Sequence, residues 1–292
     1  MVFINRVVER LFSHSHLVGL EPFHRHSRLF LSNLNCWHSS PSQHVQILSP
    51  GRSGTRWLAD VLLESSKSII VCHASPKTLA EPGYLFNQGL ISEVEALGAY
   101  RYSRSSYLKY ASLSQKCFVD LDCKNTPLAS VIADNYKHCK FVILIRDPVG
   151  FIKSGIARGY FRSKDPQAWG HLEEDAIDFR SKSSDEWQIF KIARFWNSIA
   201  TLSQRVAIAH PEMVTILDCR RMFLDPSVVN GLMDFLDLDS SLGNCAAFAK
   251  KPNATRAPIS LSVNQLDLLN SLELLDFCFD GLSSEFMASC GF

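Results

Sequence analysis

The sequence feature that most constrains the fold is the junction between an apolar run and an amphipathic segment at residues 44–66. HVQILS (44–49) has the pattern of a short strand, and RWLADVLLESS (56–66) repeats its apolar residues with helical spacing. Between them, PGRSGT (50–55) holds two glycines, which permit a tight backbone turn. The segment therefore predicts a strand, a loop and a helix in immediate succession.

The rest of the chain continues this alternation of strand and helix patterns. Strand-like apolar runs occur at 68–72, 116–121, 140–145 and 213–218, and helical patterns occur at 126–136, 147–158, 187–210, 226–238 and 262–282. Asp147 and Pro148 fit the N-cap and the first position of a helix. A mixed polar stretch of Tyr, Ser and Arg lies at 100–114. The alternation predicts an α/β fold with a central parallel sheet and helices on both faces.

The 292-residue chain has no linker rich in Pro, Gly or Ser, so we expect one α/β domain over 45–292 behind an N-terminal extension, 1–44. The extension carries six of the ten histidines, four of them in His-x-His pairs. A metal site is one interpretation, but the spacing lacks the known zinc patterns and favours a solvated extension. The same acid-poor segment fits either a transit-like sequence or an amphipathic helix.

Charge and cysteine content limit the classes of partner and compartment. Thirty Lys and Arg residues against twenty-nine Asp and Glu residues give a formal charge of +1, which argues against a nucleic-acid partner and for a local site that binds a small anion. Nine cysteines without a C-x-x-C pair predict buried free thiols in a reducing compartment. No apolar run reaches the roughly eighteen residues of a membrane span, so we expect a cytoplasmic protein without an integral membrane segment.

The loop SPGRSGT (49–55) is the first candidate site. Because it connects a strand to a helix, its backbone N–H groups and the helix N-terminus would point at one place and favour an anion there. It lacks the lysine that follows the second glycine of a Walker A loop, and its cation, Arg52, comes earlier. A purely structural turn is the alternative.

A second candidate lies where IRDP (145–148) ends an apolar run and places Arg146. Ser154 follows eight residues later on the predicted helix, so both residues could reach a ligand at the carboxyl edge of the sheet. The planar donor fork of arginine suits a terminal phosphate. The alternative for Arg146 is an ion pair with Asp147 or a helix cap.

SPGRSGTRWL (49–58) followed by FVILIRDPVGFIKS (141–154) resembles the sulfotransferases that use 3′-phosphoadenosine 5′-phosphosulfate (PAPS). Two signature segments of that family bind the 5′-phosphosulfate and the 3′-phosphate, and both are present here in that order. Further segments similar to the family are CKNTPLASVI (123–132), FWNSI (195–199), ILDCRRMFLDPSVVNGLMDFLDL (216–238) and LLDFCFDGLSSEFMASCGF (274–292). The resemblance covers 45–292 and implies a P-loop NTPase-like three-layer sandwich.

The resemblance also implies an activity: in-line transfer of a sulfuryl group from PAPS to an acceptor hydroxyl or amine, with no metal required. Arg52 would neutralise charge on the bridging oxygen, and Lys124 would orient the sulfuryl group. Arg146 and Ser154 would bind the 3′-phosphate. The residues that would hold the 5′-phosphosulfate are Gly51, Arg52, Ser53, Gly54, Thr55 and Arg56.

Two further matches to the family have alternatives of equal or greater weight. Trp57 corresponds to an aromatic residue that stacks on adenine in some relatives, and a core residue of the first helix is an equal alternative. The basic segment 250–256 is a loose match to a late phosphate-binding segment, and a solvated loop fits it better.

The general base is where the chain departs from the best-known branch of the family. Cytosolic relatives carry a catalytic histidine after the segment lysine, whereas this chain reads Lys-Asn-Thr at 124–126. Other branches place the base soon after the first signature, where this chain offers His73 and Glu81. Asp120 and Asp122 are further carboxylates near Lys124, and we expect them to be structural.

We expect segments 74–115 and 160–187 to line the acceptor side of the site. The first holds six aromatic residues, Tyr84, Phe86, Tyr100, Tyr102, Tyr107 and Tyr110, which suit a small-molecule, carbohydrate or peptide acceptor alike. Two other functions remain open: a kinase-like phosphotransferase that uses ATP, and a non-catalytic nucleotide-binding module.

Overall fold

A parallel five-stranded sheet forms the centre of the computed structural model, which describes residues 43–73, 75, 79–161, 184–238, 245–249 and 261–271. The strands are β1 (Gln43–Leu48), β2 (Ile69–Cys72), β3 (Cys117–Asp120), β4 (Cys139–Ile145) and β5 (Val214–Asp218). Their order across the sheet is β2-β3-β1-β4-β5, and every neighbouring pair is parallel. Each strand lies where an apolar run predicted one, and the predicted α/β class is confirmed.

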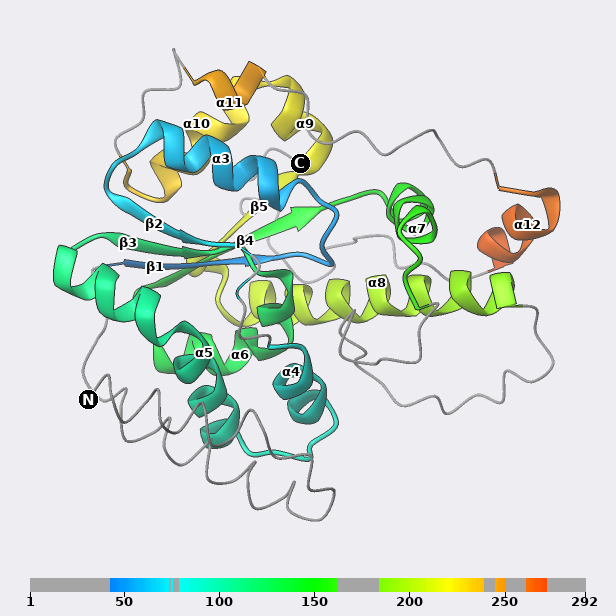
Figure 1. The fold of residues 1–292 in the computed structure, drawn as a ribbon, viewed down its shortest axis with the longest axis horizontal. Coiled ribbons are helices and arrows are strands. Elements are labelled where there is room, and N and C mark those ends of the chain that lie inside the picture. Colours follow the sequence, from blue (N-terminus) through cyan, green and yellow to red (C-terminus); the bar gives the residue numbers. More distant parts are fainter. Residues whose placement is uncertain are drawn as a thin grey trace, which may run out of the picture.

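Helices cover both faces of the sheet and give the fold three layers (Figure 1). One face is covered by α3 (Thr55–Ser65), α9 (Cys219–Leu224), α10 (Pro226–Phe235) and α11 (Ala246–Ala249). The other face is covered by α5 (Glu93–Ser114), α6 (Ala129–Asn135) and part of α8 (Ser184–Ala209), with α4 (Ala80–Asn87) next to α5. Because both faces are buried, the strands are mostly apolar, although β1 also buries His44 and Gln46.

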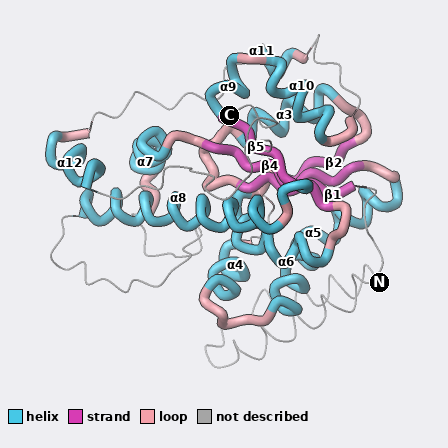
Figure 2. The backbone as a smooth tube through the Cα atoms, turned by 180° about the vertical axis from the view of Figure 1, so that it is seen from behind, coloured by secondary structure: helices cyan, strands magenta, loops and turns pink. Residues whose placement is uncertain are grey.

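A third apolar cluster lies beside the sheet and holds the chain that leaves β4. Here α7 (Pro148–Ala157) and α12 (Val263–Ser271) pack against α8, as Figure 2 shows from behind. Phe151, Ile152, Ile192 and Trp196 are buried in this cluster. The cluster therefore fixes the start of α7 close to the carboxyl end of the sheet.

Local signals explain where several helices begin. The Asp147 side chain accepts a hydrogen bond from the Gly150 N–H at 2.6 Å, and Pro148 opens α7, which confirms the predicted cap. The helix predicted at 126–136 starts as a 3₁₀ turn, η1 (Cys123–Leu128), and continues as α6. A second 3₁₀ turn, η3 (Pro211–Met213), precedes β5.

The polar stretch 100–114, for which the sequence indicated no element, is the larger part of helix α5. Its buried side holds Ser103 and Arg104 beside apolar residues, so the apolar repeat that identifies a helix is interrupted.

Several predictions lie outside the described residues. These are most of the extension (1–42), the basic segment 250–256, the C-terminal segment 272–292 and much of the predicted acceptor side (162–183). The six cysteines within the described part of the chain are free thiols, as predicted. Among the described helices, none has both the length and the apolar character needed to cross a membrane.

The strand order determines where a ligand site can form. From β1 the chain builds β2 and β3 on one side of it, and then crosses to β4 on the other side. In open α/β sheets, ligands bind at the carboxyl ends of the strands where the direction of winding reverses. The loop after β1 and the Arg146 turn after β4 both lie at this point.

Candidate functional site

The loop between β1 and α3 has a tight conformation that depends on glycine. Gly51, Arg52 and Gly54 have φ angles of 81°, 55° and 83°, a region in which a residue with a side chain is strained. The Ser49 hydroxyl accepts a hydrogen bond from the Gly51 N–H at 3.0 Å, and the Ser53 hydroxyl donates to the Gly51 carbonyl at 3.0 Å. These bonds hold the loop in one shape.

The N-terminus of α3 is suited to a negatively charged ligand. Its N-cap, Gly54, has no side chain; among the described residues no side chain caps this end, and the first turn carries no acidic residue. By contrast, α5, α7, α9 and α10 each begin with a serine or aspartate side chain that accepts a backbone hydrogen bond. The partial positive charge at the start of α3 therefore meets no competing carboxylate in that turn.

Arg146 lies beside the loop because β4 pairs with β1. Its Nη1 atom donates to the Arg52 carbonyl, and its Nη2 atom donates to the Gly150 carbonyl at 3.0 Å. The Trp196 indole donates to the Arg146 carbonyl at 3.2 Å. Burial lowers the pKa of Arg146 and the positive charge of Arg52 lowers it further, yet an arginine stays charged at neutral pH. The fold thus holds two cations close together.

Arg52 connects the two candidate segments directly. Its Nε atom donates to the Ser154 hydroxyl at 3.1 Å, and Ser154 is buried on α7. Asp147, the partner that the alternative reading gives to Arg146, caps α7. The structure therefore brings Arg52, Arg146 and Ser154 to one place beside the loop, and their roles toward a ligand stay predictions.

His73 lies at the end of β2 and points to the start of α3. Its Nε2 atom is 3.2 Å from the Thr55 hydroxyl. Burial and the positive charge of Arg56 lower the pKa of His73, although nearby aspartates act in the opposite direction. The imidazole is therefore neutral at pH 7 and has a nitrogen that can accept a proton.

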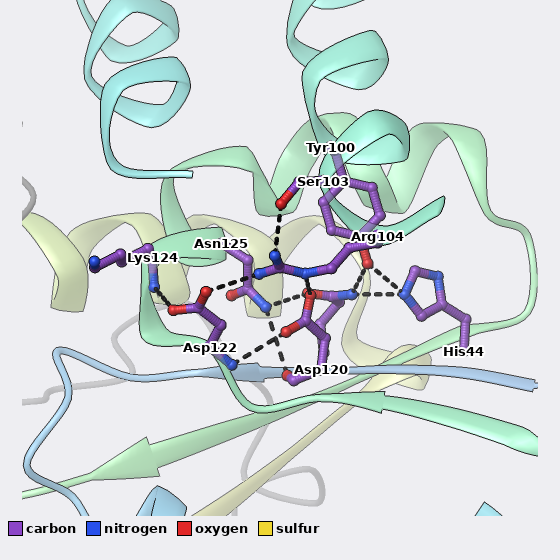
Figure 3. Close-up of polar contacts among 9 residues, drawn as sticks. His44, Tyr100, Ser103, Arg104, Asp120, Asp122, Lys124 and Asn125 are labelled. Atoms are coloured by element: carbon purple, nitrogen blue, oxygen red, sulfur yellow. Dashed lines mark hydrogen bonds and ion pairs between the residues drawn. The ribbon is translucent and has the colours of Figure 1, made fainter. Parts of the chain in front are cut away.

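Lys124 and Glu81 lie on two elements that pack against each other, η1 and α4. Lys124 is half-buried in η1, where its backbone N–H donates to Asp122 Oδ1 at 3.2 Å. Figure 3 shows the Lys124 side chain extending away from Asp122. Glu81 lies in the first turn of α4, which packs against η1.

Three other predicted residues make their side-chain contacts elsewhere, although the charge of Arg56 still acts on His73. Trp57 is 6% exposed and packs edge-on against Phe223 and Phe248, which favours the core alternative over adenine stacking. Arg56 is exposed, and its Nε atom lies 3.7 Å from Asp60 Oδ1 on the same helix. Tyr100 was predicted to line the acceptor side, and that prediction is wrong because Tyr100 is fully buried beneath the sheet.

Arg104 is a buried residue that the sequence interpretation missed. It is fully buried between Asp120 and Asp122, which confirms the structural role predicted for these two carboxylates (Figure 3). The available signal was the pair of aspartates at the end of an apolar strand, since two buried carboxylates require a cation. That signal did not indicate which cation.

The chain matches no protein-family model, and no curated protein matches it at a significant level. The sulfotransferase domain from the curacin biosynthetic pathway is similar in structure at 11% identity and a TM-score of 0.43, over 80% of this chain and 98% of that one. The sulfotransferase domain from the Synechococcus PCC 7002 olefin synthase is 15% identical with a TM-score of 0.40, over 80% of this chain and 95% of that one. A sulfotransferase from Alicyclobacillus acidocaldarius is 14% identical with a TM-score of 0.45, over 85% of this chain and 94% of that one. At these identities and TM-scores, the similarity assigns neither an activity nor a ligand to this chain.

Proposed function

We propose that this protein transfers a sulfuryl group from PAPS to a hydroxyl or amine of an acceptor. One observation carries the proposal: Arg52, Arg146 and Ser154 meet beside a glycine loop and a helix N-terminus that has no acidic residue in its first turn. Two adjacent groups of donors suit a ligand with negative charge at both the 3′ and the 5′ position of one ribose.

The residues present fit such a ligand. The Gly51–Thr55 backbone and the start of α3 would hold the 5′-phosphosulfate, and Arg146 with Ser154 would hold the 3′-phosphate. When bound, PAPS supplies an activated sulfuryl group whose bond to the phosphate oxygen breaks as a bond to the acceptor forms. Arg52 would neutralise the charge that develops on that oxygen, and Lys124, on η1, would orient the sulfuryl group.

His73 is the better candidate for the general base. It is neutral at pH 7, and its Nε2 atom lies 3.2 Å from Thr55 at the edge of the loop. A neutral imidazole in this place could take the proton of an acceptor hydroxyl as the new bond forms. The acceptor would be a small molecule, a carbohydrate or a peptide.

Thermal unfolding with different nucleotides tests the donor site without knowledge of the acceptor. We expect 3′-phosphoadenosine 5′-phosphate (PAP), at about 100 times its Kd, to add roughly 2.7 kcal/mol to the free energy of unfolding. GTP, and ATP with magnesium, should add much less. Stabilisation by ATP with magnesium and none by PAP would favour the kinase-like alternative. Stabilisation by PAP without turnover of PAPS across an acceptor screen would favour a non-catalytic nucleotide-binding module.

The pH dependence of turnover tests the base. Protonated imidazole cannot accept a proton, so turnover should fall as the pH falls through the lowered pKa of His73. His73→Gln should lower turnover by roughly 10² to 10⁴-fold and remove this acidic limb, whereas Glu81→Gln should keep it. PAP release is measured with an acceptor found by screening with PAPS. If Glu81→Gln loses the limb and His73→Gln keeps it, the roles are reversed.

A further inference from the structure

A buried ion cluster connects α5 to the turn after β3 that carries Lys124 (Figure 3). Arg104 extends from α5 and is fully buried. Its Nε atom donates to Asp120 Oδ2 at 2.6 Å, its Nη2 atom to Asp122 Oδ2 at 2.9 Å, and its Nη1 atom to the Ser103 hydroxyl at 2.7 Å. One guanidinium therefore binds two carboxylates that are two residues apart in the chain.

The same two carboxylates shape the turn that leaves β3. The second oxygen of Asp120 accepts a hydrogen bond from the Asp122 N–H at 3.1 Å, and the second oxygen of Asp122 accepts one from the Lys124 N–H at 3.2 Å. Each carboxylate thus has one oxygen on Arg104 and one on the backbone of 120–124. Through them, Arg104 ties this turn to α5.

The turn carries one site residue and contacts the glycine loop twice. Lys124 belongs to it. Cys123 packs against the loop so closely that a Cβ added at Gly51 would lie 3.2 Å from its sulfur. Further along, the Thr126 hydroxyl accepts a hydrogen bond from the Ser49 N–H at 3.2 Å. A displacement of the turn would therefore move both Lys124 and one wall of the loop.

The carboxylates of the cluster also act on the candidate base, His73, through their charge. Cys72 pairs with Asp120 across β2 and β3, and His73 is the next residue after Cys72. Among the described residues, the charged groups that act on His73 are Arg56 and Asp60 from α3, Asp120 at the end of β3, and Asp122 in the turn that follows. Arg104 balances the charge of the last two.

Stability alone does not account for a cluster of this kind. Buried ion pairs can often be replaced by apolar residues without loss of stability, because the cost of removing charges from water offsets their attraction. What an apolar replacement could not supply is the two-armed geometry of arginine, which fixes both carboxylates at once.

We propose that Arg104 is a positioning residue of this site: by holding Asp120 and Asp122 together it places Lys124, His73 and the wall of the glycine loop. Arg104 itself is buried and does not contact substrate. The inference rests on the proposed function, because that function gives Lys124 and His73 their roles.

The test compares Arg104→Lys with a control variant in the full-length protein. Arg104→Lys keeps the positive charge and loses the two-armed contact. Leu232→Ala is the control, because Leu232 is buried in α10, in the apolar cluster on the opposite face of the sheet. PAP affinity is measured by calorimetry, and the His73 ring is titrated by NMR, with its signal assigned from His73→Gln. We expect Arg104→Lys to weaken PAP binding by about tenfold or more and to shift the His73 titration midpoint, with neither change in Leu232→Ala.

A second pair of variants separates this inference from the proposed function. Arg104→Gln leaves two carboxylates without their cation, so the His73 midpoint should rise. Asp122→Asn removes a negative charge, so the midpoint should fall, and this variant serves if Arg104→Gln does not fold. If the wild-type protein does not bind PAP, the proposed function fails and these midpoints alone decide the role of Arg104. An unchanged midpoint, or equal effects of Arg104→Lys and Leu232→Ala, overturns the inference.

Discussion

At the scale of single residues, β1 shows how polar side chains are tolerated inside the sheet layer. Val45 and Ile47 pack toward α3, whereas His44 and Gln46 point to the opposite face and both contact the Tyr100 hydroxyl, at 2.7 and 2.6 Å. Burial, with the nearby charge of Arg104, lowers the pKa of His44 to about 3. His44 is therefore a neutral hydrogen-bonding residue at any physiological pH.

This neutral histidine makes stability depend on pH. Below about pH 6.5 the unfolded chain binds a proton at His44, and the folded chain does not until about pH 3. The free energy of unfolding should therefore fall with decreasing pH across that window. Plotted against pH, the free energy of unfolding of the wild-type protein should be steeper than that of His44→Gln by about 1.4 kcal/mol per pH unit, because the variant lacks this titrating group. Urea unfolding at several pH values measures both curves, and parallel curves would mean that His44 is protonated in the fold.

At the scale of elements, sequence patterns predicted the strands and helices whose formation depends on neighbouring residues in the chain. The β1–loop–α3 unit and the β4–α7 unit followed from apolar runs, the glycine loop and the Asp147 cap. Helix α5 did not, because Ser103 and Arg104 lie on its buried side and are stabilised only by residues of other elements. The segments that meet at the candidate site were therefore predictable, whereas Arg104, which joins α5 to Asp120 and Asp122, was not.

The start of α5 offers a direct test of how this polar helix is held. The Ser92 hydroxyl accepts a hydrogen bond from the Glu95 N–H at 3.3 Å, and the Glu95 carboxylate accepts one from the Ser92 N–H at 2.8 Å. Ser92→Ala should lower the free energy of unfolding by about 1 kcal/mol, measured by urea unfolding. Ser114→Ala at the other end of α5 is the control and should change it by less than about 0.5 kcal/mol. Equal losses would mean that the capping box does not stabilise the helix.

At the scale of the whole molecule, strand order brings the candidate site together. Arg52 and Arg146 are far apart in the sequence, and they meet because β4 pairs with β1 instead of with β3. Spacing and periodicity carry no signal for this order, since the strands are all short, mostly apolar and buried on both faces. The two motifs could be recognised separately, but their contact depends on the tertiary fold.

The central claim is that the site formed by the Arg52 loop and Arg146 binds a nucleotide through both its 3′- and its 5′-phosphate. Calorimetric titration of the wild-type protein and Arg146→Ala, with PAP and with adenosine 5′-monophosphate, tests it most directly. The wild-type protein should bind PAP more tightly than the monophosphate, and Arg146→Ala should lose most of that preference with little change in its affinity for the monophosphate. Equal weakening of both ligands, or no preference for PAP in the wild-type protein, would contradict the claim.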